Sequence, residues 1–266
     1  MLESCDFTLN NISSEDMGVK MVQTKGGLFE ESFLSSRKII ETSIYKGKKR
    51  YFKGVDIEPL SFPITLWLEE WAERDNIRAI ARWLSPPYYV PFWTNINPSK
   101  VLYVMVEGEP KIHHNGLKQG YINLTLRCKD EYYYSQPIVY NFKPRGSYRW
   151  TFFNEGDDVV YPKLKITNKR NDHPIIIRNH TDGKDFILNN VHLDEVVIID
   201  CENELIKSNQ EYNTRYLYDE HNDYWLDLEG ELHRNVRSHF DLEFIGEYDI
   251  EFLVQYKYIQ QGGDML

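Results

Sequence analysis

Three kinds of residue in this sequence could do chemistry: neighbouring carboxylates, histidines and cysteines. Two carboxylates can hydrolyse a glycosidic bond when one acts as an acid and the other as a base or nucleophile. The acidic pairs here occupy adjacent positions: Glu69 and Glu70, Asp157 and Asp158, Asp194 and Glu195. Adjacent side chains on a strand point to opposite faces, and adjacent acids in a turn are ordinarily solvated. These pairs therefore predict no catalytic site.

The histidines and cysteines show no metal-binding or nucleophilic pattern either. There is no His-Glu-x-x-His motif, and the pair His113-His114 precedes an Asn-Gly turn, where a solvated loop is expected. The cysteines, Cys5, Cys128 and Cys201, form no Cys-x-x-Cys pair, so three reduced, buried thiols are expected. Gly-x-Ser-x-Gly and phosphate-binding glycine loops are also missing from the sequence. We predict no enzyme activity, no catalytic residues, no metal and no cofactor.

Two hydrophobic periods meet in the first half of the chain. Apolar residues occupy every second position from Phe62 to Leu68, the period of a strand, and recur with helical spacing from Ile77 to Leu84. Asp75 or Asn76 is the expected N-cap of this helix, and Pro86 ends it. No second helix of this quality is found. The first half therefore predicts an α+β domain, with an antiparallel sheet and one short helix.

The second half contains only strand patterns. They are spaced by roughly 8–12 residues, which is typical of a β-sandwich. They include Arg215–Tyr218, Tyr224–Leu228 and two final strands, His239–Phe244 and Tyr248–Tyr258. The sequence therefore predicts a mainly β chain whose second half is a β-sandwich.

Length and charge favour two domains, which we place at residues 1–135 and 136–266. A chain of 266 residues is near the upper limit for one core. The formal net charge of −10 lies entirely in residues 136–266, because basic and acidic residues balance before them. The lack of a basic stripe argues against sequence-specific binding of nucleic acid. Neither a transmembrane run nor a signal peptide is visible, so no membrane association is expected.

The segment that follows the helix is unusually aromatic: Tyr88-Tyr89-Val90-Pro91-Phe92-Trp93. It is apolar on too many sides for an isolated loop. Large aromatic side chains anchor protein interfaces, so one prediction is that Tyr88, Tyr89, Phe92 and Trp93 make a subunit contact. The alternative is that the segment folds over its own sheet as core.

With these elements placed, the chain resembles the distal tail proteins of long-tailed bacteriophages that infect Gram-positive bacteria. The resemblance covers nearly the full length and rests on the order and spacing of several strand and turn segments. These are Phe7–Ile12, Ile77–Leu84, Val101–Gly108, Asn154–Gly156, Tyr161–Ile166, Ile177–Gly183, Glu195–Asp200 and Tyr224–Leu228. None of these segments is a catalytic signature.

The resemblance implies a first domain that assembles into a homo-hexameric ring and a second domain that is a galectin-like β-sandwich. Such a ring joins the tail tube to the tail-tip hub or baseplate and leaves a central channel for DNA. The implied partners are the tail tube protein, a tail-associated hub or lysin protein, and a receptor-binding protein or fibre. The implied location is the tail tip of the virion, after synthesis in the host bacterial cytoplasm.

A second function stays open from the sequence. A galectin-like sandwich could be a carbohydrate-binding module that contacts the host cell wall, with Trp150 and Trp225 stacking on the sugar. True galectins, however, carry a His-x-Asn-x-Arg strand, which this sequence lacks. Trp225 is therefore better explained as a core or interface residue.

Overall fold

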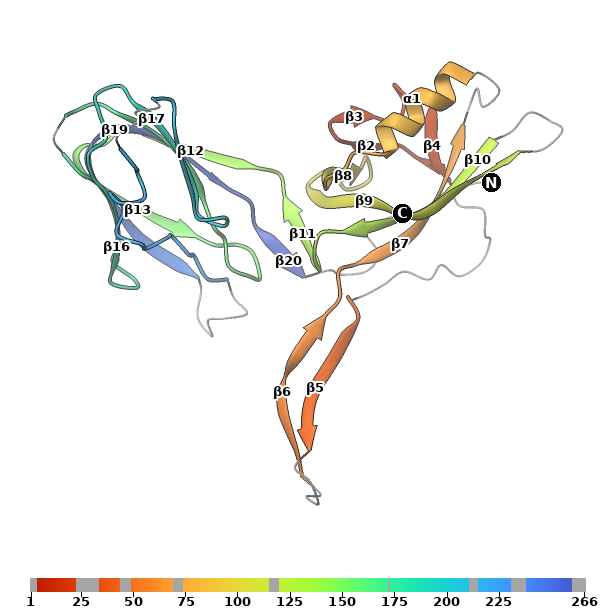
Figure 1. The fold of residues 1–266 in the computed structure, drawn as a ribbon, viewed down its shortest axis with the longest axis horizontal. Helices are drawn as coiled ribbons and strands as arrows, with labels where there is room; N and C mark the ends of the chain where they lie inside the picture. The colour runs from red at the N-terminus through yellow and green to blue at the C-terminus, as the bar shows by residue number, and fades with distance from the viewer. Residues whose placement is uncertain are drawn as a thin grey trace. The chain divides into compact units, whose positions relative to one another are not determined.

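The computed structural model describes residues 4–22, 34–43, 49–68, 74–114, 120–171, 173–210, 215–230 and 238–259. Two compact units make up the chain. The first contains the residues up to Tyr134 together with Ile259, and the second is Ser135–Tyr258. The return of the chain to the first unit at Ile259 was not predicted, because that residue was placed in the sandwich domain. The predicted fold class is confirmed: within the described ranges the chain is mainly β with one helix (Figure 1).

An antiparallel sheet forms the first unit. Its strands lie in the order β1-β4-β7-β10-β9-β8-β2-β3, and β11 pairs with β9 and β20. The strands are β1 (Ser4–Cys5), β2 (Phe7–Leu9), β3 (Ile12–Ser13), β4 (Val19–Val22), β7 (Ser61–Leu68), β8 (Val90–Thr94), β9 (Lys100–His114), β10 (Gly120–Cys128) and β11 (Tyr132–Ser135). The strand β20 (Lys257–Ile259) belongs to this unit only at its last residue, Ile259. A further antiparallel pair, β5 (Arg37–Ser43) and β6 (Arg50–Ile57), forms a separate two-stranded sheet.

The alternation from Phe62 to Leu68 predicted the buried face of β7 correctly. Phe62, Ile64, Leu66 and Leu68 are buried, whereas the residues between them are partly or fully exposed. Successive side chains of a strand point to opposite faces, so this pattern places one face of β7 on the core. The preceding strand β6 ends at Ile57 and belongs to the other sheet.

The helix α1 (Arg74–Leu84) packs on the sheet through Trp83. The Trp83 ring stacks on Phe7 with 5.6 Å between ring centroids, and its Nε1–H donates to the carbonyl oxygen of Leu9 at 3.0 Å. Asp75 lies in the first turn of the helix, so the prediction that Asp75 or Asn76 is the N-cap was wrong. The buried face is also shifted from the predicted one, since Trp83 is buried and Ala81 is exposed.

Replacing Trp83 with phenylalanine is expected to destabilise the protein by about 1–3 kcal/mol, because the carbonyl of Leu9 loses its buried donor. Urea unfolding followed by circular dichroism measures this change. The partly exposed Trp67 on β7 provides a control, since its replacement by phenylalanine should change stability by no more than about 0.5 kcal/mol. Equal effects of the two substitutions would contradict the role given to the Trp83 hydrogen bond.

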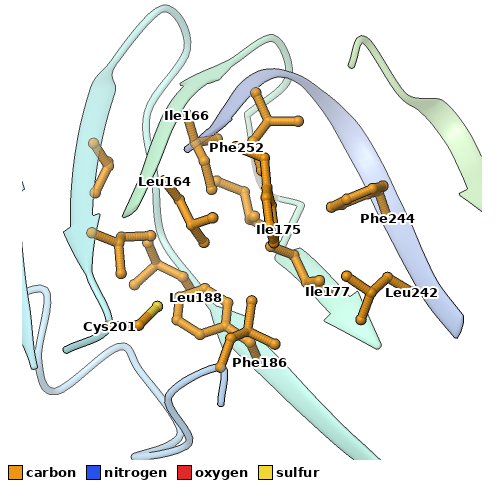
Figure 2. Packing of buried hydrophobic residues seen from close by; sticks show 14 of the residues in the cluster. Leu164, Ile166, Ile175, Ile177, Phe186, Leu188, Cys201, Leu242, Phe244 and Phe252 are labelled. Carbon is orange, nitrogen blue, oxygen red and sulfur yellow. The ribbon is translucent and has the colours of Figure 1, made fainter. Parts of the chain in front are cut away.

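The second unit is a sandwich of antiparallel strands. Its strands are β12 (Ile138–Phe142), β13 (Arg145–Phe153), β14 (Lys163–Asn168), β15 (Ile175–Asn179), β16 (Lys184–Leu188), β17 (Val196–Asp200), β18 (Leu205–Ser208) and β19 (His239–Val254). The order is β16-β15-β19-β14-β17-β18, and both β12 and β13 also pair with β19. The side chains of its core come from both layers, including Leu164 and Ile166 of β14 and Phe244 and Phe252 of β19 (Figure 2).

One long strand, β19, belongs to both layers of this sandwich. Its first part pairs with β13 and β15, and its second part pairs with β12 and β14. The change falls at Gly246, whose φ of 134° is a conformation that residues with a side chain rarely adopt. A Cβ atom there would lie 3.0 Å from the ring of Tyr248. The sequence predicted two strands here, but glycine lets one continuous strand pass between the layers.

The predicted strands Arg215–Tyr218 and Tyr224–Leu228 were wrong. Residues 217–220 form a turn, and the strand-type pairing of residues 215–230 is limited to isolated bridges at His221 and Leu228. Leu226 and Leu228 are nevertheless completely buried. The apolar pattern therefore reported burial correctly, but the buried segment covers the core without joining a sheet.

Candidate assembly interface

The pair β5–β6 is the most exposed apolar feature of the first unit. Every residue of β5 is exposed, and both faces of the pair carry large apolar side chains because neighbours such as Ile39 and Ile40 point in opposite directions. Its exposed apolar residues are Ile39, Ile40, Tyr51, Phe52 and Val55. Phe52 and Ile39 are the most exposed, at 67% and 63%. Large apolar side chains gathered on exposed strands in this way indicate an interaction surface.

Little holds this hairpin together apart from its backbone ladder. The ion pair between Arg50 and Glu41 spans 3.2 Å, but the two side chains are 76% and 37% exposed. Pairs in such solvated positions contribute about 0–1 kcal/mol. An isolated two-stranded hairpin is marginally stable in water. The β5–β6 hairpin therefore gains stability if another surface covers its apolar side chains.

The residues of the aromatic segment that was predicted as a subunit contact differ in their exposure. Phe92 is only 1% exposed and packs against Phe7 and Phe62, so it belongs to the core of its own chain and is not available at the surface. Trp93 is partly buried beside a hollow that Lys100, Tyr133 and neighbouring residues also line. Tyr88 and Tyr89 are exposed, at 59% and 36%. The contact stays a prediction for Trp93 and for these two tyrosines.

The two tryptophans proposed for sugar stacking both pack against the sandwich core. The Trp150 ring lies 4.8 Å from the centroids of both Tyr140 and Phe142 and 5.4 Å from that of Phe252. Trp225 packs on His221, with 4.5 Å between ring centroids. Both tryptophans are partly buried. These contacts explain the two side chains as packing residues, so they supply no observation that favours the carbohydrate-binding function.

His221 is a buried histidine that packs between Phe186 and Trp225. Its Nε2 lies 3.0 Å from the carbonyl oxygen of Tyr224, whereas its Nδ1 is buried without a hydrogen-bond partner among the described residues. Burial lowers the pKa of His221 below its ordinary value of 6.5. A second proton would place an N–H at Nδ1, where none of the described groups accepts it.

We expect the protein to lose stability as the pH falls below about 6.5, because the unfolded chain then binds a proton that the folded His221 does not. This contribution is complete above pH 6.5 and disappears as the pH falls towards the lower pKa of the folded state. Melting temperatures measured between about pH 7 and pH 5 test it. The variant His221→Gln, which retains a donor for Tyr224, should lose this part of the pH dependence, and an unchanged pH profile would contradict it.

The neighbouring acids Asp194 and Glu195 lie in different surroundings. Glu195 is completely buried, whereas the neighbouring Asp194 is exposed and pairs with Lys169 at 2.8 Å. Glu69 and Glu70 lie outside the described residues.

No group of three or more histidine, cysteine or acidic residues that could hold a metal is found in the described part of the chain. Cys5, Cys128 and Cys201 are buried and free, and burial raises the pKa of each thiol.

A serine, a glutamate and a histidine do meet on the outer face of the sandwich, but in an order that cannot activate the serine. Ser147 Oγ donates to Glu243 at 2.5 Å, and His180 Nε2 lies 2.7 Å from the other oxygen of the same carboxylate. These two hydrogen bonds lower the pKa of Glu243. In a catalytic triad the histidine lies between the serine and the acid, so that it can take the serine proton. Here the carboxylate lies between them, and the cluster is a surface hydrogen-bond network.

Comparison with known proteins identifies the class to which this fold belongs. Residues 2–130 match the family of phage tail protein N-terminal domains, and residues 132–244 match that of phage tail C-terminal domains. The chain belongs to the phage tail proteins and is therefore a virion component. The SPβ prophage-derived protein YomH of Bacillus subtilis strain 168 is 26% identical over 97% of this chain and 99% of its own length.

The fold is that of the distal tail protein, or Dit. The Dit protein of phage SPP1 superposes with a TM-score of 0.65 at 12% identity, over 96% of this chain and 100% of its own. It is described as a hub of the adsorption apparatus in phages that infect Gram-positive bacteria. A chain of the phage P2 baseplate superposes with a TM-score of 0.61 at 9% identity, over 98% of this chain and 99% of its own. These matches confirm the predicted resemblance. No helix among the described residues is long and apolar enough to cross a membrane.

Proposed function

We propose that this protein is a structural subunit of a hexameric ring that joins the phage tail tube to the tail-tip hub or baseplate and leaves a central channel for DNA. The observation that carries the proposal is the exposed, apolar β5–β6 hairpin, which extends from a domain of the phage tail family. Its apolar side chains on both faces need a protein surface to cover them. A neighbouring copy of the same chain provides that surface.

A hairpin that packs against a different surface of the next copy makes a head-to-tail contact. Such contacts close into rings when the rotation between copies divides a full turn. The fold supports the same interpretation, because the SPP1 protein with this fold is described as a hub. The tail tube protein, a hub or lysin protein and a receptor-binding protein or fibre are the proposed partners. We infer synthesis in the host cytoplasm followed by incorporation into the tail tip.

We also propose that the protein acts through assembly and not as an enzyme. The cluster of Ser147, Glu243 and His180 does not place the histidine where it could activate the serine, and the matched families are tail proteins. Purified protein incubated with cell walls of a Gram-positive bacterium should release no sugar or peptide fragments. Release that persists after repurification of the protein would overturn this part of the proposal.

The mass of the purified protein in solution tests the ring directly. Size exclusion coupled to light scattering, over a range of protein concentrations, should show a rise from 31.7 kDa, the mass of one chain, towards six times that value. A monomer at every concentration, in the absence and in the presence of the neighbouring tail tube and hub proteins, would overturn the proposal.

A further inference from the structure

One side of the second unit has its sheet edges closed by side chains. The segment that was predicted to contain two strands runs past the outer strands β16 and β18. Asn222 accepts a hydrogen bond from Ile187 N at 3.0 Å and donates to the Asp185 carbonyl at 2.7 Å. The hydroxyl of Tyr218 accepts from Ile206 N at 3.0 Å. Backbone groups at these edges therefore have partners, which is how edge strands avoid pairing with other chains.

The other side of the unit is open. Among the described residues, β12 and β13 pair only with β19. Residues directly opposite each other in an antiparallel pair alternate between exchanging hydrogen bonds and exchanging none. Tyr248 N donates to the Pro144 carbonyl, and Asn154 N donates to Ser238, so even-numbered residues of this edge bond towards β19. The backbone groups of Ser147, Arg149 and Thr151 consequently point away from β19, to the open edge.

The side chains of this open edge have a distinct chemical character. No acidic residue occurs between Pro137 and Phe153, although the second half of the chain is acidic overall. Lys143 is exposed, and Arg149 is 65% exposed with its nearest carboxylate, Glu243, at 3.9 Å. On the inner face of the same edge, Tyr148 is 46% exposed and Trp150 is partly buried. The charged side chains of the edge segment itself are thus positive, while Glu243 and Asp241 of the neighbouring β19 bind the hydroxyls of Ser147 and Thr151 on the same face. Aromatic side chains line the other face.

We propose that the open edge of β13 binds an extended segment of another protein, which adds a strand to the sandwich. Backbone hydrogen bonds to Ser147, Arg149 and Thr151 would give affinity, and alternate side chains would give specificity. Acidic residues of the segment face Arg149 and Lys143, and apolar residues between them cover Tyr148 and Trp150. The partner segment therefore alternates acidic and apolar residues. This proposal does not depend on ring formation by the first unit.

A second copy of the same chain is a poor occupant of this edge. Two β13 edges that pair antiparallel with Arg149 at the centre place the two Arg149 side chains opposite each other, and like charges that face each other across strands are destabilising. Arg145 adds little to this repulsion, because its guanidinium is already bound to Asp249 and to the Tyr248 carbonyl, so the repulsion comes from Arg149. Charge therefore favours a different, acidic segment.

Labelled nine-residue peptides test the proposal on the full chain. One peptide alternates Glu and Val, and its matched control alternates Lys and Val. Fluorescence anisotropy should show binding of the Glu-Val peptide that weakens as salt is added, and binding of the Lys-Val peptide weaker by at least about tenfold. Equal binding of both peptides, or no binding of either, would overturn the proposal.

Variants of Ser147 distinguish strand addition from attraction by surface charge. Ser147→Pro removes an outward N–H that β19 does not use, so binding of the Glu-Val peptide should fall by at least about tenfold, whereas Ser147→Ala should retain it. Arg149→Gln should weaken binding by about threefold. If the proline variant does not fold, amide hydrogen exchange of residues 145–153 in the unsubstituted protein provides the test. The bound peptide should slow this exchange, and exchange that stays unchanged while the peptide is bound would overturn the proposal.

Discussion

Replacing Phe52 with serine is expected to prevent ring formation while the folded subunit persists. Phe52 is 67% exposed on a hairpin that no other described part of the chain covers, so its ring contributes little to the fold of the monomer. A surface substitution of this kind changes stability by no more than about 0.5 kcal/mol. An aromatic residue at the centre of an interface commonly contributes about 2 kcal/mol or more to binding. Its loss would therefore weaken each subunit contact by about thirtyfold.

Light scattering and thermal melting of the same sample separate the two effects. The Phe52→Ser variant should remain near the mass of one chain at concentrations where the unsubstituted protein forms a ring, with an unchanged melting temperature. Tyr216 in the second unit is 72% exposed and provides a matched control, since Tyr216→Ser should not alter the mass. A Phe52→Ser protein that still forms the full ring would show that the hairpin does not make the subunit contact.

The buried face of β7 could be predicted from sequence because local pattern and burial coincide there. Phe62 and Leu66 are buried and the residues beside them are not, as expected when one face of a strand covers a core. The same reasoning identified the helix but misjudged its face. Trp83 is buried because its ring reaches Phe7 and its N–H reaches Leu9, residues far away in the sequence. Helical spacing alone cannot reveal such contacts.

The strands β12 and β13 were missed, although their pattern is present in the sequence. Tyr148, Trp150 and Phe152 alternate with polar residues, but Pro144 and Gly146 lie just before them and interrupt the pattern. The two strands continue past Pro144 because both run along the same partner, β19, in one register. That partner lies near the end of the chain, and only the fold brings the segments together.

The exposure of the β5–β6 hairpin could not be predicted from the sequence. Residues such as Ile39 and Phe52 have the composition of a buried strand. Whether other elements cover such a strand depends on the topology of the whole domain, and the sequence of the strand does not reveal it. In this chain β5 pairs only with β6 among the described strands, so the apolar residues stay at the surface. The predicted aromatic contact failed at Phe92 for the converse reason, because β8 lies within the main sheet.

The acidic residues of the second domain are also not equivalent, and Glu195 is the clearest case. Its carboxylate is completely buried and accepts hydrogen bonds from Ser208, from Arg215 and from His192 N. Burial alone would raise the pKa of Glu195, but these donors and the positive charge of Arg215 outweigh it and hold the pKa below the ordinary value of 4.5. The Arg215 side chain is only 9% exposed and also donates to the Asn190 carbonyl.

Replacing Arg215 with methionine should therefore cost about 3–5 kcal/mol at neutral pH, because Glu195 stays buried without its cation. The neighbouring pair of Lys169 and Asp194 is a matched control: its side chains are 33% and 67% exposed, so Lys169→Met should cost no more than about 1 kcal/mol. Urea unfolding measures both changes. Equal costs would mean that the buried pair contributes no more than the exposed one.

The pH dependence of the Arg215→Met variant distinguishes an unpaired charge from lost packing. In the unsubstituted protein the pKa of Glu195 is lowered, so its contribution is complete above about pH 4.5 and is lost as the pH falls through the folded-state value. Without Arg215, burial raises this pKa, the folded state binds the proton first, and acid stabilises the variant relative to neutral pH. The cost of the substitution should shrink between about pH 7 and pH 5, and Glu195→Gln added to Arg215→Met should recover part of the loss. A cost that is the same at both pH values would assign the whole effect to lost packing, because packing does not depend on protonation.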